Sequence, residues 1–186
     1  MVYVFEGSRN SGKSYLSEML SIQNGISRFQ FNFVGGFNLL GLENSDNRES
    51  HSFAMGKELM LMQIARDLKD CPTFIHDRGI LTVLAWGLSE NRITENAVDK
   101  QIEYLKENDL FSNITIIYID GENPVKSDRN KDQWDYADKT SREKDCFELV
   151  IDKFENAGIR VVRIENTFTF STVIDLGILI KLFNLK

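Results

Sequence analysis

The 186-residue sequence contains few of the residues that cross-link small proteins or bind metals. It has two cysteines, two histidines and two prolines. Cys71 and Cys146 lie far apart, and neither has a second cysteine or a histidine at metal-ligand spacing. We therefore expect two buried thiols rather than a disulfide or zinc framework. His51 and His76 are equally isolated, and we interpret both as structural residues rather than parts of a metal site or a catalytic triad.

Long apolar runs and an excess of positive charge are also missing. The most apolar late stretch, residues 173–183, is too short to span a bilayer and carries Asp175 and Lys181. Apolar residues begin at Val2 with no basic segment before them, so we expect no signal peptide. The formal net charge of −6 argues against an extended nucleic-acid interface. We expect a cytoplasmic protein without membrane contacts, and the sequence leaves a homodimer open.

The sequence does contain alternating strand and helix patterns. Its length, with 42% hydrophobic and 27% charged residues, suits a single domain over residues 1–186 with one ordinary core. Strands are expected at 2–5, 29–33, 73–76, 114–119 and 159–164. Helices are expected after Lys13 and at 53–68, 80–88, 94–108, 140–157 and 173–183, the fifth opening on a capping box at 140–143. This alternation predicts a three-layer α/β fold, with a parallel sheet of about five strands and helices on both faces.

The first strand leads directly into a phosphate-loop motif. Residues 7–14 read GSRNSGKS and match G-x-x-x-x-G-K-[ST]. Between a strand and a helix, this motif directs backbone N–H groups and the positive end of the helix toward phosphate. We expect Lys13 to reach the β- and γ-phosphates and Ser14 to bind Mg²⁺. The predicted nucleotide-binding residues are Gly7, Arg9, Asn10, Ser11, Gly12, Lys13 and Ser14.

Two other segments separate the classes of phosphate-loop protein. A switch GTPase needs N-K-x-D and D-x-x-G, but residues 130–133 read NKDQ and residues 77–80 read DRGI. A kinase instead needs an acid near the metal, a cation for the acceptor and mobile cations over the transferred group. The Asp77-Arg78 pair and the charged, aperiodic segment 121–140 provide such residues.

Two motifs together resemble the thymidylate kinase and deoxynucleoside kinase group. They are Phe5-Glu6-Gly7 before Gly12-Lys13-Ser14, and FIHDRGILTVLAWG at residues 74–87. The resemblance implies that Asp77 lies beside Mg²⁺ and the acceptor oxygen and that Arg78 binds phosphates. It also implies a mobile lid at about 121–140, where Arg129, with Lys131 or Arg142, would reach the transition state. Trp86 replaces the tyrosine of that family's helix, and we favour a core position for it over the acceptor pocket.

The sequence departs from the family where the acceptor would bind. Thymidylate kinases carry R-E-P-G-G-T after the second strand, whereas this chain reads FNFVGGFNLLG. Arg9 stands where the family commonly has an acid that meets the sugar. A cation at that position favours a more anionic acceptor, or supplies charge in the transition state.

The motifs together predict an ATP- and Mg²⁺-dependent phosphotransferase. Its catalytic residues would be Lys13, Asp77, Arg78 and Arg129, with Ser14 and Asp77 at the metal. The first hypothesis for the acceptor is a small nucleotide, dTMP or another deoxynucleoside monophosphate. Two alternatives remain open: a kinase that acts on a nucleoside or on a hydroxyl within nucleic acid, and a nucleotide-binding regulatory NTPase.

Overall fold

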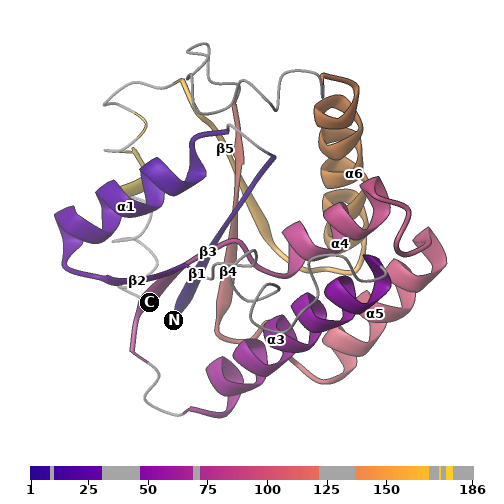
Figure 1. Cartoon of the computed structure of the whole chain (residues 1–186). Coiled ribbons are helices and arrows are strands. Elements are labelled where there is room, and N and C mark those ends of the chain that lie inside the picture. The colour runs from indigo at the N-terminus through magenta and orange to yellow at the C-terminus, as the bar shows by residue number, and fades with distance from the viewer. Residues whose placement is uncertain are drawn as a thin grey trace.

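A five-stranded parallel sheet forms the centre of the computed structural model, which describes residues 1–8, 11–30, 47–68, 72–121, 137–167, 172 and 175–177 (Figure 1). The strands run in the order β2-β3-β1-β4-β5, and every pair is parallel. Their bounds are β1 Val2–Glu6, β2 Ser27–Gln30, β3 Phe74–Asp77, β4 Ile114–Asp120 and β5 Val161–Glu165. The order places β1 between β3 and β4, so all three carboxyl ends meet at one edge of the sheet.

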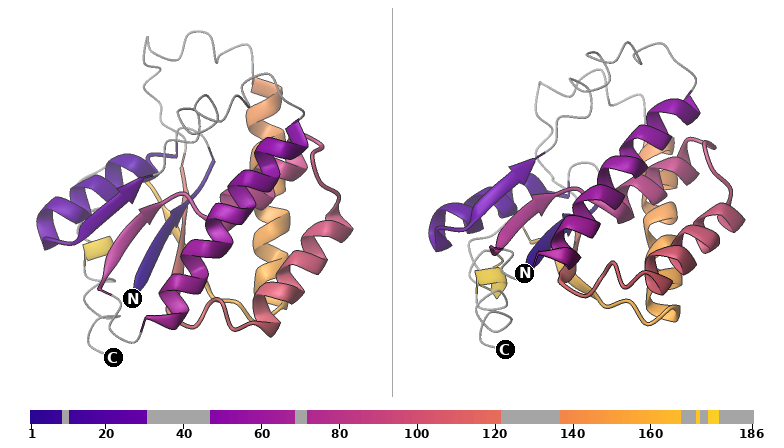
Figure 2. Two further views of the ribbon diagram at one scale, coloured as in Figure 1. Left: turned by 60° about the horizontal axis from the view of Figure 1, so that its bottom comes forward. Right: turned by 90° about the horizontal axis from the view of Figure 1, so that it is seen from below.

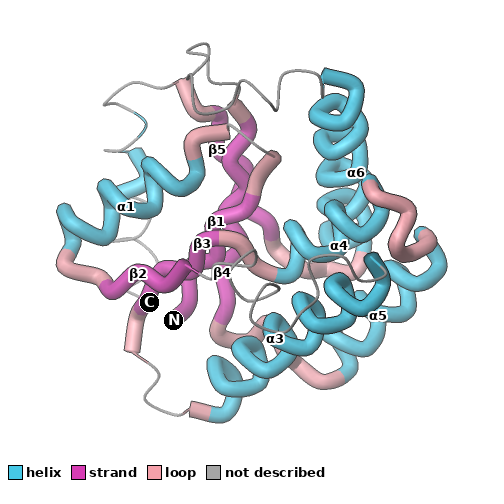
Figure 3. The backbone as a smooth tube through the Cα atoms, viewed as in Figure 1, coloured by secondary structure: helices cyan, strands magenta, loops and turns pink. Residues whose placement is uncertain are grey.

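Helices cover both faces of this sheet. Helix α1, Lys13–Asn24, lies on one face, where Leu176 of the short helical segment 175–177 packs against Leu16 and Leu20. The remaining described helices gather on the opposite face (Figures 2 and 3). These are α3 Asn47–Asp67, α4 Ile80–Ser89, α5 Glu95–Glu107 and α6 Ala137–Asn156. The predicted three-layer α/β fold with five parallel strands is therefore confirmed. Among the described helices, none combines the length and the apolar character needed to cross a membrane.

The side chains of β1 alternate between two apolar clusters. Tyr3 and Phe5 pack with Leu16 and Leu20 of α1, while Val2 and Val4 face the layer of α3. All five residues of β1 are buried, as expected for an interior parallel strand covered on both faces. Glu6, the last residue of β1, is the charged exception, and it belongs to the site described below.

Most of the expected element positions are confirmed, with shifted ends. Strand β2 is an edge strand as predicted, although residues 31–33 lie outside the described part of the chain. Helix α3 begins at Asn47, earlier than expected. Its first turns are polar and show no apolar periodicity, so the sequence pattern did not indicate them. The capping-box prediction is wrong: α6 begins at Ala137, so residues 140–143 lie within it. Most of the expected closing helix, and residues 122–136, also lie outside the described residues.

Candidate active site

The phosphate loop lies at the carboxyl end of β1, and its shape requires its first glycine. Gly7 has φ +151°, and a Cβ there would lie 2.6 Å from the carbonyl oxygen of Ile119 and 2.7 Å from Ser11 Oγ. Gly12, at φ 84°, occupies the N-cap of α1 in the left-handed region. The chain therefore turns tightly between β1 and α1, and the N-terminus of α1 opens onto this turn.

Lys13 is buried at the start of α1. Its Nζ donates a hydrogen bond to the carbonyl oxygen of Ser8 at 3.0 Å, and 3% of the residue is exposed. Burial, followed by the charge of Arg78, lowers the pKa of Lys13 to about 7, while Asp77 and Glu143 raise it. Ser11 Oγ is buried with no hydrogen-bond partner among the described residues. A buried cation and an unsatisfied hydroxyl in one loop are the groups that a phosphate would satisfy.

The far side of the loop is braced by the end of β5. Asn166 donates from Nδ2 to the carbonyl oxygen of Ser11 at 2.8 Å and from its backbone N to that of Asp120 at 2.6 Å. A polar cavity of about 490 Å³ opens beside it, at the ends of β4 and β5. Lys144 and Arg163 are among the side chains that line this cavity.

Asp77 lies at the end of β3, in register with Phe5 of β1, and is 1% exposed. Arg28 of β2 donates from Nη2 to Asp77 Oδ2 at 2.6 Å. Asp77 Oδ1 is buried and has no hydrogen-bond partner in the described structure. Arg28 also donates from Nε to Ser17 Oγ of α1 at 2.8 Å, and Ser17 donates to the carbonyl oxygen of Ser14. Arg28 thus connects the predicted acid of β3 to the first turn of α1.

The two residues after Asp77 form a tight turn into α4. Arg78 has φ 71°, a left-handed conformation that a residue with a side chain rarely adopts. Its backbone N donates to the carbonyl oxygen of Phe5 at 2.9 Å. A Cβ on Gly79 would lie 2.5 Å from Val4 Cγ1 and 3.0 Å from Glu6 Oε1, so glycine fits this position without displacing its neighbours. A strained, crowded turn of this kind is typical of functional sites.

The side chain of Glu6 holds this turn in place. Its fully buried carboxylate accepts hydrogen bonds from the backbone N of Gly79 at 3.1 Å, of Leu81 at 3.0 Å and of Thr82 at 3.1 Å. The Thr82 hydroxyl donates a fourth bond. Burial raises the pKa of Glu6, and the bonds from Thr82 and Gly79 act in the opposite direction. The carboxylate is therefore the N-terminal cap of α4, supplied by a strand 73 residues earlier in the chain.

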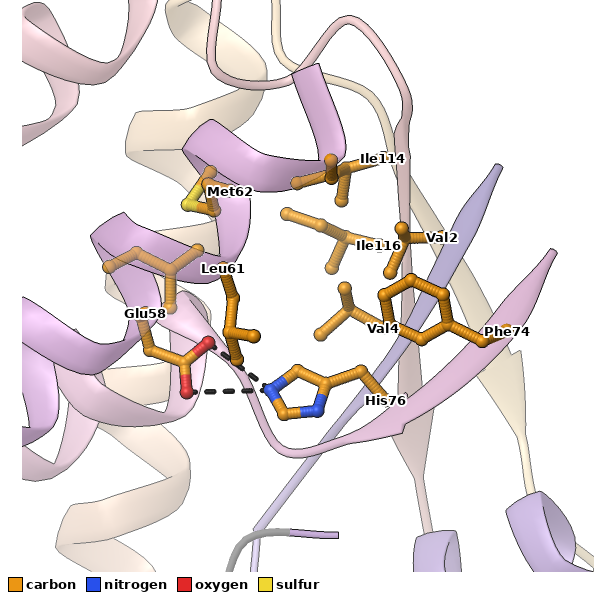
Figure 4. Close-up of a pocket in the computed structure, with 11 residues that line it drawn as sticks. Val2, Val4, Glu58, Leu61, Met62, Phe74, His76, Ile114 and Ile116 are labelled. Atoms are coloured by element: carbon orange, nitrogen blue, oxygen red, sulfur yellow. Dashed lines mark hydrogen bonds and ion pairs between the residues drawn. The ribbon is translucent and has the colours of Figure 1, made fainter. Parts of the chain in front are cut away.

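A second buried polar group lies between α3 and the sheet. His76 Nε2 is 3.3 Å from Glu58 Oε2, and Lys57 forms an ion pair with the same carboxylate. Figure 4 shows Glu58 and His76 facing each other at one end of a cavity of about 20 Å³ whose other labelled side chains are apolar. The cavity has room for about one water molecule. His76 is buried against α3, in agreement with the structural role expected for it.

Comparisons with known proteins give the fold. Models of protein families yield no match to this sequence, and curated protein sequences yield no relative. The YorR protein from Bacillus subtilis, solved in complex with phosphorylated GDP, has a TM-score of 0.59 and 17% identity over 100% of this chain and 99% of that chain. Deoxyadenosine kinase from M. mycoides, with bound dCTP, has a TM-score of 0.55 and 17% identity over 99% of this chain and 100% of that chain. This chain has the fold of the P-loop kinases.

A more distant similarity extends to a larger protein. The putative polyphosphate kinase 2 from Pseudomonas aeruginosa PA01 has a TM-score of 0.52 and 14% identity over 88% of this chain and 34% of that chain. At these identities the similarity establishes the P-loop kinase fold, and the chemistry has to be argued from this chain's own residues.

The structure brings together most of the residues predicted from the sequence. Gly7, Ser11, Gly12, Lys13, Ser14, Asp77 and Arg78 surround one edge of the P-loop kinase sheet. Arg9, Asn10, Arg129 and Lys131 lie outside the described residues. Arg142 donates to Asn91 Oδ1, between α4 and α5. Trp86 is half-buried beneath the guanidinium of Arg92, 3.7 Å from its ring centre, so the core position predicted for it is wrong.

The donor set of this edge fits Mg²⁺. No group of three or more His, Cys, Asp or Glu side chains that could hold a metal occurs in the part of the chain that the structure describes. Mg²⁺ usually keeps several waters and takes only one or two carboxylates from the protein, with the remaining contacts from substrate phosphates. Asp77 Oδ1, buried and without a partner among the described residues, and the partly exposed Ser14 at the start of α1 are suited to that role.

Proposed function

We propose that the protein is a cytoplasmic, Mg²⁺-dependent nucleotide kinase that transfers the γ-phosphoryl group of ATP to a deoxynucleoside monophosphate, with dTMP as the first candidate. The buried carboxylate of Asp77 carries this proposal, because Arg28 forms an ion pair with it and its charge acts on the buried Lys13 of the phosphate loop. A nucleotide-binding regulator would need the phosphate loop, but not a buried acid with cations around it. Phosphoryl transfer needs both, because catalysis there consists of positioning and charge stabilisation.

Each side chain receives a role from its position. Lys13 and the backbone N–H groups of residues 7–14, including Arg9, Asn10 and Ser11, would hold the β- and γ-phosphates. Ser14 and Asp77 would hold Mg²⁺, which when bound neutralises and orients the phosphate oxygens. Arg78, fixed by its strained backbone, would bind the phosphates from the side of β3. The cavity beside Asn166 would receive the rest of the ATP molecule.

The acceptor and the lid follow from sequence arguments. Deoxyadenosine kinase, a structural neighbour, acts on a deoxynucleoside, and YorR was solved with a phosphorylated nucleotide, so a small nucleotide acceptor agrees with the shared fold. Arg9 would favour an acceptor that already carries a phosphate. We also propose that residues 121–140 close over the phosphates as a lid within a single domain, and that Arg129 then contacts the transferred group.

One assay separates the alternatives. Consumption of ATP is measured with nucleosides, deoxynucleoside monophosphates and short DNA as acceptors, for the wild type, Lys13→Ala and Arg66→Gln. Arg66 forms an exposed ion pair with Asp67 and serves as the control. We expect transfer to a monophosphate, and a loss of about 10²-fold or more in Lys13→Ala because a preorganised cation is removed. Transfer to nucleosides only would replace the acceptor class, and no transfer with intact ATP binding would favour a regulator.

A further inference from the structure

The two carboxylate oxygens of Asp77 have different surroundings. Oδ2 accepts a hydrogen bond from Arg28 Nη2 at 2.6 Å, while Oδ1 is buried with no partner among the described residues. The Asp77 side chain is 0% exposed and that of Arg28 is 18% exposed, so the pair is largely withdrawn from water. An ion pair with a charge-assisted hydrogen bond of this length is strong, and water screens it little.

Arg28 is held in place by more than this one contact. Its Nε donates to Ser17 Oγ of α1 at 2.8 Å, and Nη2 also reaches Gln30 Oε1 of β2 at 3.2 Å. The guanidinium is therefore fixed between the edge strand and the helix that begins at Lys13. A lysine could supply the charge but not this planar set of donors.

We propose that Arg28 is a built-in counter-ion that regulates metal binding at Asp77. It leaves only Oδ1 for a metal and neutralises the carboxylate until phosphates bring further negative charge. The site would then bind Mg²⁺ together with a nucleotide and not before it. This inference rests on the proposed function because it takes Asp77 as the metal-binding acid. Arg28 is a positioning residue in this account, since it acts through Asp77.

The charges around Asp77 support this order of binding. Arg28 forms an ion pair with the Asp77 carboxylate, whose charge also acts on the buried Lys13. A divalent cation arriving alone would meet the positive charge of Arg28 and the one oxygen of Asp77, Oδ1, that has no partner among the described residues. Triphosphate oxygens reverse the balance, because they supply both ligands and negative charge. Without Arg28, Asp77 would be a buried and poorly compensated anion that attracts a free divalent cation.

The test uses Mn²⁺ as an electron paramagnetic resonance probe, so it does not depend on catalytic activity. The nucleotide-free full chain is titrated as wild type, Arg28→Gln, Arg28→Lys and the control Arg66→Gln. We expect Arg28→Gln to bind Mn²⁺ more tightly than the wild type, by about tenfold or more, because a positive charge next to the carboxylate is removed. Arg28→Lys should stay close to the wild type, because it keeps the charge. Equal affinity in the wild type and Arg28→Gln would overturn the proposal.

Two further measurements extend the test, and the first of them does not require Arg28→Gln to fold. In the wild type, a non-hydrolysable ATP analogue should tighten Mn²⁺ binding strongly. Equally tight Mn²⁺ binding with and without the analogue would refute the counter-ion role. In the double variant Arg28→Gln/Asp77→Asn, the gain in Mn²⁺ affinity should disappear, and a persisting gain would place the metal elsewhere and overturn the proposal.

Kinetics separate this inference from the kinase proposal. Arg28→Gln should lower the Mg²⁺ concentration at half-maximal rate and also lower kcat, because Asp77 loses its fixed orientation. A merely structural arginine would change stability without the shift in Mg²⁺ dependence. If the wild type phosphorylates no acceptor while Arg28→Gln still gains Mn²⁺ affinity, the kinase proposal fails and the counter-ion role stands.

Discussion

Replacement of Glu6 by glutamine tests whether the cap of α4 holds the site together. In the wild type, Oε1 accepts from the backbone N of Gly79 and Leu81, and Oε2 accepts from the backbone N and the hydroxyl of Thr82. The glutamine side chain keeps one acceptor oxygen. Its NH₂ group, itself a donor, would face two of the four donors, which then lose their acceptor. Hydrogen bonds to a charged group contribute about 1.5–3 kcal/mol each, so the loss of two gives about 3–6 kcal/mol.

Part of this loss is offset, because a neutral amide costs less to bury than a carboxylate. Burial raises the pKa of Glu6, which shows that the charged form carries a desolvation cost. We expect a net loss of about 2–3 kcal/mol in the free energy of unfolding. For a chain of this size the melting temperature should then fall by about 4–12 °C.

The assay is urea unfolding followed by circular dichroism, with Thr94→Ala as the matched control. Thr94 caps α5 from an exposed position, and its hydroxyl accepts one bond from the backbone N of Ala97 at 3.3 Å. Its loss should cost about 1 kcal/mol. Glu6→Gln should also lower kcat, since the Asp77-Arg78 turn leads into the capped helix. Stability within about 0.5 kcal/mol of the wild type would show that desolvation cancels the hydrogen bonds and refute the reasoning.

Three further predictions concern buried groups. Lys13→Met should raise the stability of the nucleotide-free protein most at pH 6, as measured by thermal unfolding. This gain should shrink between about pH 7 and 10.5, because the buried lysine loses its proton at a lower pH in the folded state than in the unfolded state. Burial and Arg92 lower the pKa of His51 to about 4, so the wild type should lose stability relative to His51→Asn as the pH falls from 6.5 to 4; parallel profiles would contradict this. Gly87→Ala should destabilise the wild type by about 1–3 kcal/mol in urea, because its Cβ would lie 2.5 Å from His51 Cε1. The loss should be smaller in His51→Ala, where Ile93 Cδ1 at 2.9 Å is left as a close contact, and an equal loss in both backgrounds would contradict this.

The parts of the site that the sequence predicted have local signatures. The phosphate loop consists of eight consecutive residues, and its glycines stand where the backbone conformation disfavours a side chain. At Gly7, for example, a Cβ would clash with the carbonyl oxygen of Ile119. Asp77 follows an apolar run, and its place at the ligand-binding edge follows from the general rule that ligands gather at the carboxyl ends of parallel strands. Both signals can be interpreted without knowing which strands pair.

Arg28 and Glu6 were missed because their roles depend on that pairing. A single arginine in a polar edge strand has no pattern of its own, and only the β2–β3 register brings it within reach of a side chain 49 residues later. Glu6 ends β1 like an ordinary surface residue, yet it caps a helix that starts 74 residues further on. The capping box at residues 140–143 failed for the opposite reason, since a local pattern was outweighed by an earlier helix start.

The bond between Asn166 and Ser11 has a consequence for the order of folding. It joins residues 155 positions apart, so the phosphate loop is completed by a segment that is synthesised much later. Contacts of such long range close large loops and form slowly. A nascent chain carrying β1 and α1 would therefore have the glycines and the lysine of the loop without its brace. If the loop binds nucleotide as proposed, binding during refolding should appear only when β5 docks, and a nucleotide can then report on that step.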